Sequence, residues 1–222
     1  MNWHADSLTS TGLAGILAIA ASACALTSKA ELTNIRYFSP ERLTWQHNDA
    51  HPVSVPAVTT PNGPVQVRLG RVSSGANLRE RIAYRDTAYE LGYYEDLRWT
   101  ERPETYVRRE LGRALFATHL VQHVLGSSIP TLDVEVIAFD DLRLTTGRAV
   151  RVQLSIILYD EQSVLLEDTL TTEQPVIGNN PLIEDMIAAM GHALEQITEQ
   201  IAVNVKTTLL AQRPVPTQAL SD

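Results

Sequence analysis

Two histidines in the middle of the chain, His119 and His123, have the spacing of a zinc site. Residues four apart share one face of a helix, and two imidazoles placed in this way bind zinc in many hydrolases. The residues between them are Leu-Val-Gln, so no glutamate is present as a general base, and no spacing identifies a third ligand. We predict that both histidines are structural or solvated and that the chain has no metal site. A metal-dependent hydrolase is the catalytic alternative.

Four carboxylates lie close together further along the chain, and paired carboxylates can transfer protons or bind calcium. Asp133 and Glu135 alternate with apolar residues, a pattern typical of a strand with one solvated face. Asp140 and Asp141 follow in a segment that we interpret as a turn. The sequence has no Gly-x-Ser-x-Gly motif and no glycine-rich phosphate loop after a strand. We predict no catalytic residue, no cofactor and no enzymatic activity.

The composition is that of a folded, acidic protein. The chain has 222 residues, of which 44% are hydrophobic, enough for one domain with a sizeable core. The net charge is −8, from 26 acidic and 18 basic residues, which argues against a nucleic-acid partner and against electrostatic docking on anionic lipid. The one cysteine, Cys24, excludes an intramolecular disulfide.

The start of the chain predicts a lipoprotein signal peptide over residues 1–23. Residues 13–23 are apolar and uncharged, too few to span a bilayer but enough for the apolar region of a signal peptide. Ala-Ser-Ala leads directly to Cys24, as in a lipobox, although the first twelve residues lack the usual Lys or Arg. We predict that Cys24 carries the lipid anchor. The alternative is a buried first helix with a structural cysteine.

The rest of the chain contains one domain without an internal repeat or an interdomain linker. Residues 24–33 are small and polar and are predicted to be a tether. Residues 34–211 are predicted to form the domain, and residues 212–222, with two prolines, a disordered tail.

The stretch over residues 81–115 predicts a β-hairpin followed by a helix. Aromatic and branched residues alternate with polar ones over residues 81–85 and again over Tyr89–Tyr94, which favours two strands. Pro103 suits the first position of a helix, where its missing N–H leaves no bond unmade. Arg98-Trp99 is expected between the second strand and this helix.

Alternation and apolar periodicity predict the remaining elements. Further strands are expected over residues 33–38, 64–72, 132–139, 150–159 and 164–172, with a turn at 140–147. Asn180 and Pro181 are expected to start a last helix, which carries one apolar stripe from Ile183 to Leu209. The predicted fold class is α/β (α+β), with a mixed, largely antiparallel sheet of about six strands and two long helices on one face.

This order of elements resembles the ABC-type transport auxiliary lipoproteins, companions of MCE-domain lipid transporters in Gram-negative envelopes. The residues that carry the resemblance are Tyr84-Arg85, Tyr93-Tyr94, Arg98-Trp99 and Pro103 with the helix through Leu115. A looser similarity extends the match over about residues 30–210 and adds Tyr37-Phe38, the strand near Asp133–Phe139, two further strands and the last helix.

The resemblance implies a periplasmic lipoprotein that works with an MCE protein, an ABC permease and an ATPase, as a docking element and possible homo-oligomer. Ala25 follows the anchor cysteine, and by the sorting rule that comes with the resemblance, the absence of aspartate there implies the outer membrane. Two alternative functions remain open. One is a periplasmic metal-dependent hydrolase, and the other is a lipoprotein activator of cell-wall synthesis or a secretion-pore subunit.

The hairpin supplies the predicted partner-binding residues, Arg85, Tyr93, Tyr94, Arg98 and Trp99. Arginine, tyrosine and tryptophan are the residues most favoured as interface anchors. We expect Tyr94 to face away from the row that contains Tyr93 and to contact a partner. The alternative is that these aromatic residues pack the hairpin against the following helix.

Overall fold

The computed structural model describes residues 34–41, 64–116, 121–124, 126, 128–145, 147–178 and 180–212. Apart from Asn34, these belong to one compact unit that begins at Ile35. The predicted signal peptide and tether, His119 and all of the predicted tail except Gln212 lie outside the described residues, so the predictions about them stay predictions.

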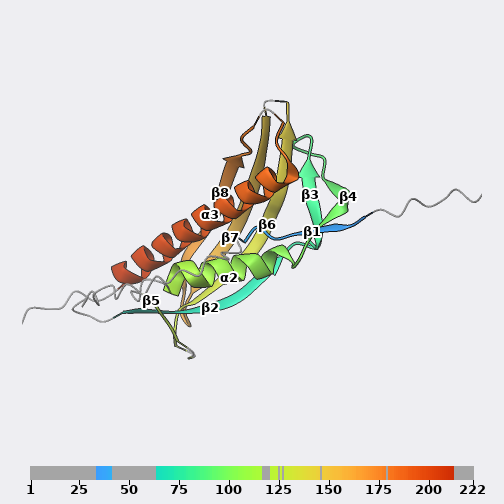
Figure 1. The fold of residues 1–222 in the computed structure, drawn as a ribbon. Coiled ribbons are helices and arrows are strands. Elements are labelled where there is room, and N and C mark those ends of the chain that lie inside the picture. The colour runs from blue at the N-terminus through green and yellow to red at the C-terminus, as the bar shows by residue number, and fades with distance from the viewer. Residues whose placement is uncertain are drawn as a thin grey trace, which may run out of the picture. The chain divides into compact units, whose positions relative to one another are not determined.

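Eight strands form one mixed sheet, and two helices pack against it in the described part of the chain (Figure 1). The elements are β1 (Arg36–Phe38), β2 (Val65–Ser74), β3 (Arg81–Arg85), β4 (Gly92–Trp99), α2 (Pro103–Phe116), β5 (Val121–His123), β6 (Thr131–Leu144), β7 (Gly147–Tyr159), β8 (Val164–Pro175) and α3 (Ile183–Ala211). The predicted fold class is confirmed, with eight strands in place of about six.

The longest strand, β6, holds the sheet together. One of its edges pairs antiparallel with β7 from Thr131 to Leu144, and β7 pairs antiparallel with β8. The other edge is shared by two shorter strands that run parallel to β6. β2 pairs with its first half and β3 with residues 140–142. β4 and β1 extend the sheet beyond β3, and β5 extends it beyond β2.

Both helices cover the same face of this sheet, as predicted (Figure 1). α3 packs on β7 and β8, α2 packs on β2 and β6, and the two helices contact each other. Every residue of the predicted stripe on α3 is buried except Ile183, which is partly buried. Under α2, the fully buried Trp99 packs edge-on against Phe139 at 5.2 Å and Tyr106 at 6.2 Å between ring centroids. These contacts close one hydrophobic core.

The two helices begin in different ways. α2 begins at Pro103, as predicted. The predicted start of α3 is wrong, because the helix begins at Ile183 with Leu182 in the N-cap position. There the Asp185 carboxylate accepts the backbone N–H of Leu182 at 2.8 Å, which satisfies a donor at the helix start without an Asn180 cap.

The hairpin differs from its prediction in its second strand. β4 begins at Gly92, so residues 89–91 lie in the connection and Tyr89 is 97% exposed. The hydroxyl of Thr87 accepts the backbone N–H groups of Tyr89 and Glu90, a local turn that competes with strand pairing. β4 then continues to Trp99, so Arg98-Trp99 lies inside the strand rather than between strand and helix.

The turn predicted at residues 140–147 is also wrong for its first half. β6 continues to Leu144, and Asp140 and Asp141 are fully buried within it. Aspartate is rare inside strands and in cores, which is why the sequence pattern favoured a turn. The strand continues because arginines from neighbouring strands pair with both carboxylates.

Candidate functional site

Asp141 is the centre of a buried polar cluster on the face of the sheet that carries the helices. Its two carboxylate oxygens accept hydrogen bonds from Arg148 at 3.0 and 2.9 Å. The hydroxyl of Tyr94 donates to the same carboxylate at 2.5 Å. Arg148 also donates to the backbone carbonyl of Pro181, just before α3, at 3.3 Å. One carboxylate thus connects β4, β6, β7 and the start of α3.

The environment of Tyr94 keeps its hydroxyl protonated. Burial and, after it, the hydrogen bond to Asp141 together raise the pKa of Tyr94 to about 12. The phenol is therefore a hydrogen-bond donor at neutral pH and not a base. Tyr94 was expected to face outward, but in the structure its ring is half-buried against the core and its hydroxyl bonds within the domain.

Asp140 forms a second cluster on the opposite face of the sheet. Its Oδ2 accepts hydrogen bonds from Arg85 of β3 at 2.8 Å and from Arg151 of β7 at 2.7 Å. Two further buried atoms, Oδ1 of Asp140 and Nε of Arg151, have no hydrogen-bond partner among the described residues. Arg85, predicted to bind a partner, is thus held by a carboxylate of its own domain and keeps 20% of its side chain exposed.

The other three predicted partner-binding residues also make their contacts within the domain. Tyr93 donates its hydroxyl to the backbone carbonyl of Asn77 at 2.9 Å and stays partly exposed. Arg98 donates to two backbone carbonyls of its own strand, those of Tyr94 and Leu97. Trp99 is buried in the core. The sequence thus brings these residues to one hairpin, while the structure divides them between core, strand interior and surface.

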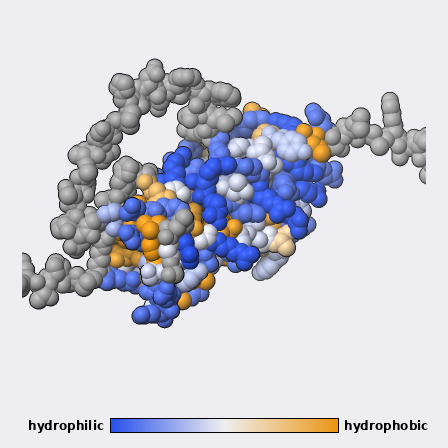
Figure 2. Space-filling model, turned by 90° about the horizontal axis from the view of Figure 1, so that it is seen from below, coloured by the Kyte–Doolittle hydropathy of each residue, from blue (hydrophilic) through white to orange (hydrophobic). Residues whose placement is uncertain are grey.

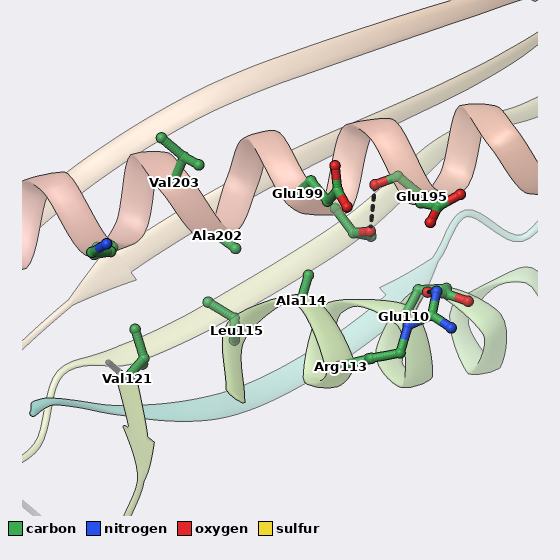
Figure 3. Close-up of a pocket in the computed structure, with 11 residues that line it drawn as sticks. Glu110, Arg113, Ala114, Leu115, Val121, Glu195, Glu199, Ala202 and Val203 are labelled. Atoms are coloured by element: carbon green, nitrogen blue, oxygen red, sulfur yellow. Dashed lines mark hydrogen bonds and ion pairs between the residues drawn. The ribbon is translucent and has the colours of Figure 1, made fainter. Parts of the chain in front are cut away.

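A groove lies between α2 and α3 in the described part of the chain (Figure 3). It has a volume of about 460 Å³, and small or apolar side chains from both helices and β5 line its floor. Ala114 and Leu115 from α2 lie across from Ala202 on α3, and Val121 closes one end (Figure 3). In Figure 2, hydrophobic residues gather towards the end of the molecule where β5 and the last turns of α3 lie.

Carboxylates form the rim of this groove. Glu110 comes from α2, and Glu195 and Glu199 come from α3 (Figure 3). Burial raises the pKa of Glu110, although Arg113 lowers it in part through charge attraction. A second hollow of about 480 Å³ adjoins along the same helices, where Pro40 and Glu41 lie. The groove thus combines an apolar floor with a largely acidic rim.

The described residues do not bring together a set of groups for metal chemistry. No three of the described His, Cys, Asp and Glu side chains are placed to hold one ion. His123 is exposed on β5 with its ring 4.9 Å from that of Phe116, and its predicted partner His119 lies outside the described residues. Asp133 accepts the backbone N–H of Arg71 at 2.7 Å on a partly exposed face, in line with the solvated strand face predicted for it.

Sequence reasoning missed the arginines that complete the two clusters, Arg148 and Arg151. The signal that points to them is the Asp-Asp pair next to an apolar strand, because buried carboxylates need cationic partners. Sequence reasoning also missed the groove, since its lining comes from three elements far apart in the chain. No helix in the described part of the chain is both long and apolar enough to cross a bilayer.

Comparisons with known proteins identify the domain. A model of the family described as "ABC-type transport auxiliary lipoprotein component" matches residues 49–202. No curated protein matches the sequence. Protein XCC0632 from Xanthomonas campestris is 21% identical with a TM-score of 0.60, and the match covers 68% of this chain and 91% of that chain. An uncharacterized protein of solved structure is 14% identical with a TM-score of 0.59, covering 78% and 99%.

At these identities, the two solved structures show a shared fold and no more. The family model carries more weight, because it spans well over half of the chain and includes α2, α3 as far as Ala202 and both aspartate clusters. The chain belongs to the family of ABC-type transport auxiliary lipoprotein components.

Proposed function

We propose that this protein is a periplasmic lipoprotein subunit of an MCE/ABC-type lipid transport system. It is anchored to the outer membrane and docks or scaffolds the machinery that moves lipid between membranes. The observation that carries the proposal is the family match over residues 49–202. We name the MCE-domain protein, the permease and the ATPase as partners because the hairpin–helix motif resembles that of the family.

Docking fits the placement of the motif residues better than catalysis does. The arginines and aromatic residues of the hairpin bond to the domain itself, and so they stiffen a surface rather than converge on a substrate. A rigid surface binds with less loss of conformational freedom than a mobile one. The contact residues in this proposal are Arg85, Tyr93 and Arg98, with Tyr94 and Trp99 as the support beneath them.

The lipid anchor is assigned to Cys24, the residue that follows the predicted signal peptide. The test is fractionation of cell envelopes from cells that produce the full chain or its Cys24→Ser variant. The unchanged chain is expected in the outer-membrane fraction and the variant in the soluble periplasm. A soluble wild-type protein that retains residues 1–23 would reject the anchor.

Partner binding is tested by co-purification of the tagged full chain from solubilised envelopes. The MCE-domain protein, its permease and its ATPase are expected to co-purify with the unchanged chain. Tyr93→Ala removes a partly exposed ring from the hairpin surface and is expected to weaken binding by about 2 kcal/mol, near thirtyfold. Val164→Ala is the matched control, since Val164 is exposed in a different part of the sheet.

Equal melting temperatures with loss of the partner only in Tyr93→Ala would support the hairpin as the docking surface. Loss of the partner in neither variant would remove Tyr93 from the contact. An unchanged chain that co-purifies with cell-wall synthases or secretion-pore subunits, and never with an MCE protein, would replace the proposed system with the alternative one.

A further inference from the structure

Three connections of the domain meet at one end of the sheet, which we call the tip. Its described residues are 86–91, 144, 145 and 147 of the β6–β7 turn, 176–178 and 180–182. β3 and β6 run parallel, with Arg85 beside Leu142, so both strands end there. β7 begins there because Gly147 pairs with Leu144. β8 ends there, since Pro175 pairs with Ala149, and the chain then turns into α3 (Figure 1).

Ion pairs and hydrogen bonds hold the three connections together. Arg143 binds both carboxylate oxygens of Asp86 at 2.8 and 2.7 Å, which links the β6–β7 hairpin to the β3–β4 connection. The carbonyl of Arg148 accepts the backbone N–H of Val176 at 2.9 Å, and its guanidinium donates to Pro181. The tip is therefore a cross-linked surface and not three independent loops.

This cross-linked surface carries large apolar side chains that have no cover within the described residues. Tyr89 is 97% exposed, Ile177 84% and Leu182 63%, and Leu144 is also exposed. They come from all three connections, so strand alternation does not explain their exposure at one end of the sheet. Contiguous exposed apolar side chains commonly mark a surface that contacts a partner or a membrane.

The first strand lies within side-chain reach of the start of α3. Arg36 of β1 donates to Glu184 in the first turn of α3 at 2.7 Å, so β1 starts beside the start of α3. Ile35 and Tyr37, which flank Arg36, are exposed as well. Cys24 precedes Asn34 by ten residues, and ten extended residues span at most about 35 Å. An anchor at Cys24 therefore holds the start of β1 within about 35 Å of a bilayer.

We infer that the tip rests on the membrane that holds the lipid anchor, with Tyr89, Ile177 and Leu182 entering the headgroup layer. The inference rests on the proposed anchor at Cys24. Two carboxylates near the tip are neutralised by arginine, Asp86 by Arg143 and Glu184 by Arg36, whereas the exposed Glu90 has no ion pair among the described residues. Tyrosine, with an apolar ring and a polar end, is also suited to a membrane interface.

A lipid surface fits these observations better than a second protein does. A single acyl chain holds a protein only marginally and several chains hold it firmly without fixing its orientation, so apolar contacts near the anchor add orientation. The net charge of −8 gives no attraction to anionic lipid, so the contact relies on apolar side chains. In this orientation, the far end of the sheet, at the β7–β8 turn, points away from the membrane.

The test places one fluorescent label on the full chain at a time, through Tyr89→Cys, Ile177→Cys or Val164→Cys. Val164 is an exposed apolar residue beside the β7–β8 turn, and the 13 residues of β7 separate it from the tip by about 40 Å. Each lipidated variant is reconstituted into vesicles of phosphatidylethanolamine and phosphatidylglycerol that contain phosphatidylcholine spin-labelled near the headgroup. Quenching at positions 89 and 177 is expected to exceed that at position 164 at least twofold.

The outcomes separate the inference from the proposed anchor, because vesicle flotation is measured on the same samples. Flotation that depends on Cys24, with equally weak quenching at all three positions, keeps the anchor and overturns the inference. Preferential quenching at 89 and 177 in a chain whose flotation does not need Cys24 supports the membrane contact of the tip but rejects the anchor as its cause. Labels at the tip that respond to protein concentration but not to spin-labelled lipid would assign the tip to a second copy and overturn the inference.

Discussion

Asp140 and Asp141 are adjacent in β6, yet their carboxylates lie on opposite faces of the sheet, and each is neutralised by arginine from neighbouring strands. Asp140 accepts from Arg85 and Arg151, and Asp141 accepts from Arg148 and the Tyr94 hydroxyl. Because successive side chains of a strand alternate between faces, one dipeptide ties β6 to its neighbours on both sides. Arg85 and Tyr94, two of the residues that carry the resemblance seen in the sequence, are therefore structural partners of this dipeptide.

Asp141→Asn is expected to lower the free energy of unfolding by about 3–5 kcal/mol, because it leaves Arg148 without its buried counter-charge. The matched control is Asp86→Asn, which breaks a more exposed pair with Arg143 and is expected to change stability by about 1 kcal/mol or less. Urea unfolding of both variants measures the difference. Equal effects would mean that the burial of Asp141 contributes nothing to the strength of its pairing.

Tyr94→Phe removes one hydrogen bond to a carboxylate and leaves the ring in place. We expect a loss of about 1.5–3 kcal/mol in the free energy of unfolding, with Tyr93→Phe as a control that loses a neutral, more exposed hydrogen bond. Urea unfolding at neutral pH compares the two. A loss in Tyr94→Phe no greater than that in Tyr93→Phe would contradict the internal role of this hydroxyl.

The raised pKa of Tyr94 also predicts a pH dependence of stability. The pKa is 10.0 for an ordinary tyrosine and about 12 in the folded protein, so between these values the unfolded chain binds fewer protons. The contribution of Tyr94 is complete below pH 10 and is lost as the pH rises from about 10 to 12. Over this range the free energy of unfolding should fall less steeply with pH in Tyr94→Phe than in the unchanged protein. Absorbance titration of the folded protein should show a signal near pH 12 that Tyr94→Phe lacks.

Two glycines in helices are expected to respond in opposite directions to replacement by alanine. A Cβ at Gly191 of α3 would lie 2.4 Å from the backbone carbonyl oxygen of Pro40, whereas a Cβ at Gly112 of α2 meets nothing within 4 Å. Gly112→Ala should stabilise the protein by about 0.5–1 kcal/mol, the usual gain in a helix. Gly191→Ala should lose that gain and destabilise, because the Pro40 backbone must move away from α3. Thermal melts of both variants decide this, and stabilisation in both would contradict the close contact.

Ile197→Asp is expected to unfold the domain, since Ile197 is fully buried in the stripe of α3 and an unpaired buried charge is among the most destabilising single changes. Val203→Asp, on the same helix but 61% exposed, should melt close to the unchanged protein. Circular dichroism at increasing temperature measures both. A folded Ile197→Asp that loses a partner would instead place the stripe at an interface.

Much of the architecture follows from local pattern in the sequence. Alternating residues predicted the core of β6, β7 and β8, because strand side chains must point to alternate faces whatever lies beyond them. The apolar stripe of α3 and the proline at the start of α2 are equally local. The family resemblance seen in the sequence also rests on the order of such elements along the chain.

The tertiary structure decided everything that depends on pairing between distant residues. Asp140 and Asp141 look like turn residues until Arg85, Arg148 and Arg151 from other strands supply their counter-charges, since only a partner distant in sequence lets a carboxylate be buried. Tyr94 was expected to face outward. Alternation shows that Tyr93 and Tyr94 point to opposite faces of the sheet, but it cannot show which of the two faces the helices will cover. The groove and the tip likewise join segments far apart in the chain, and such contacts are set by packing rather than by local propensity.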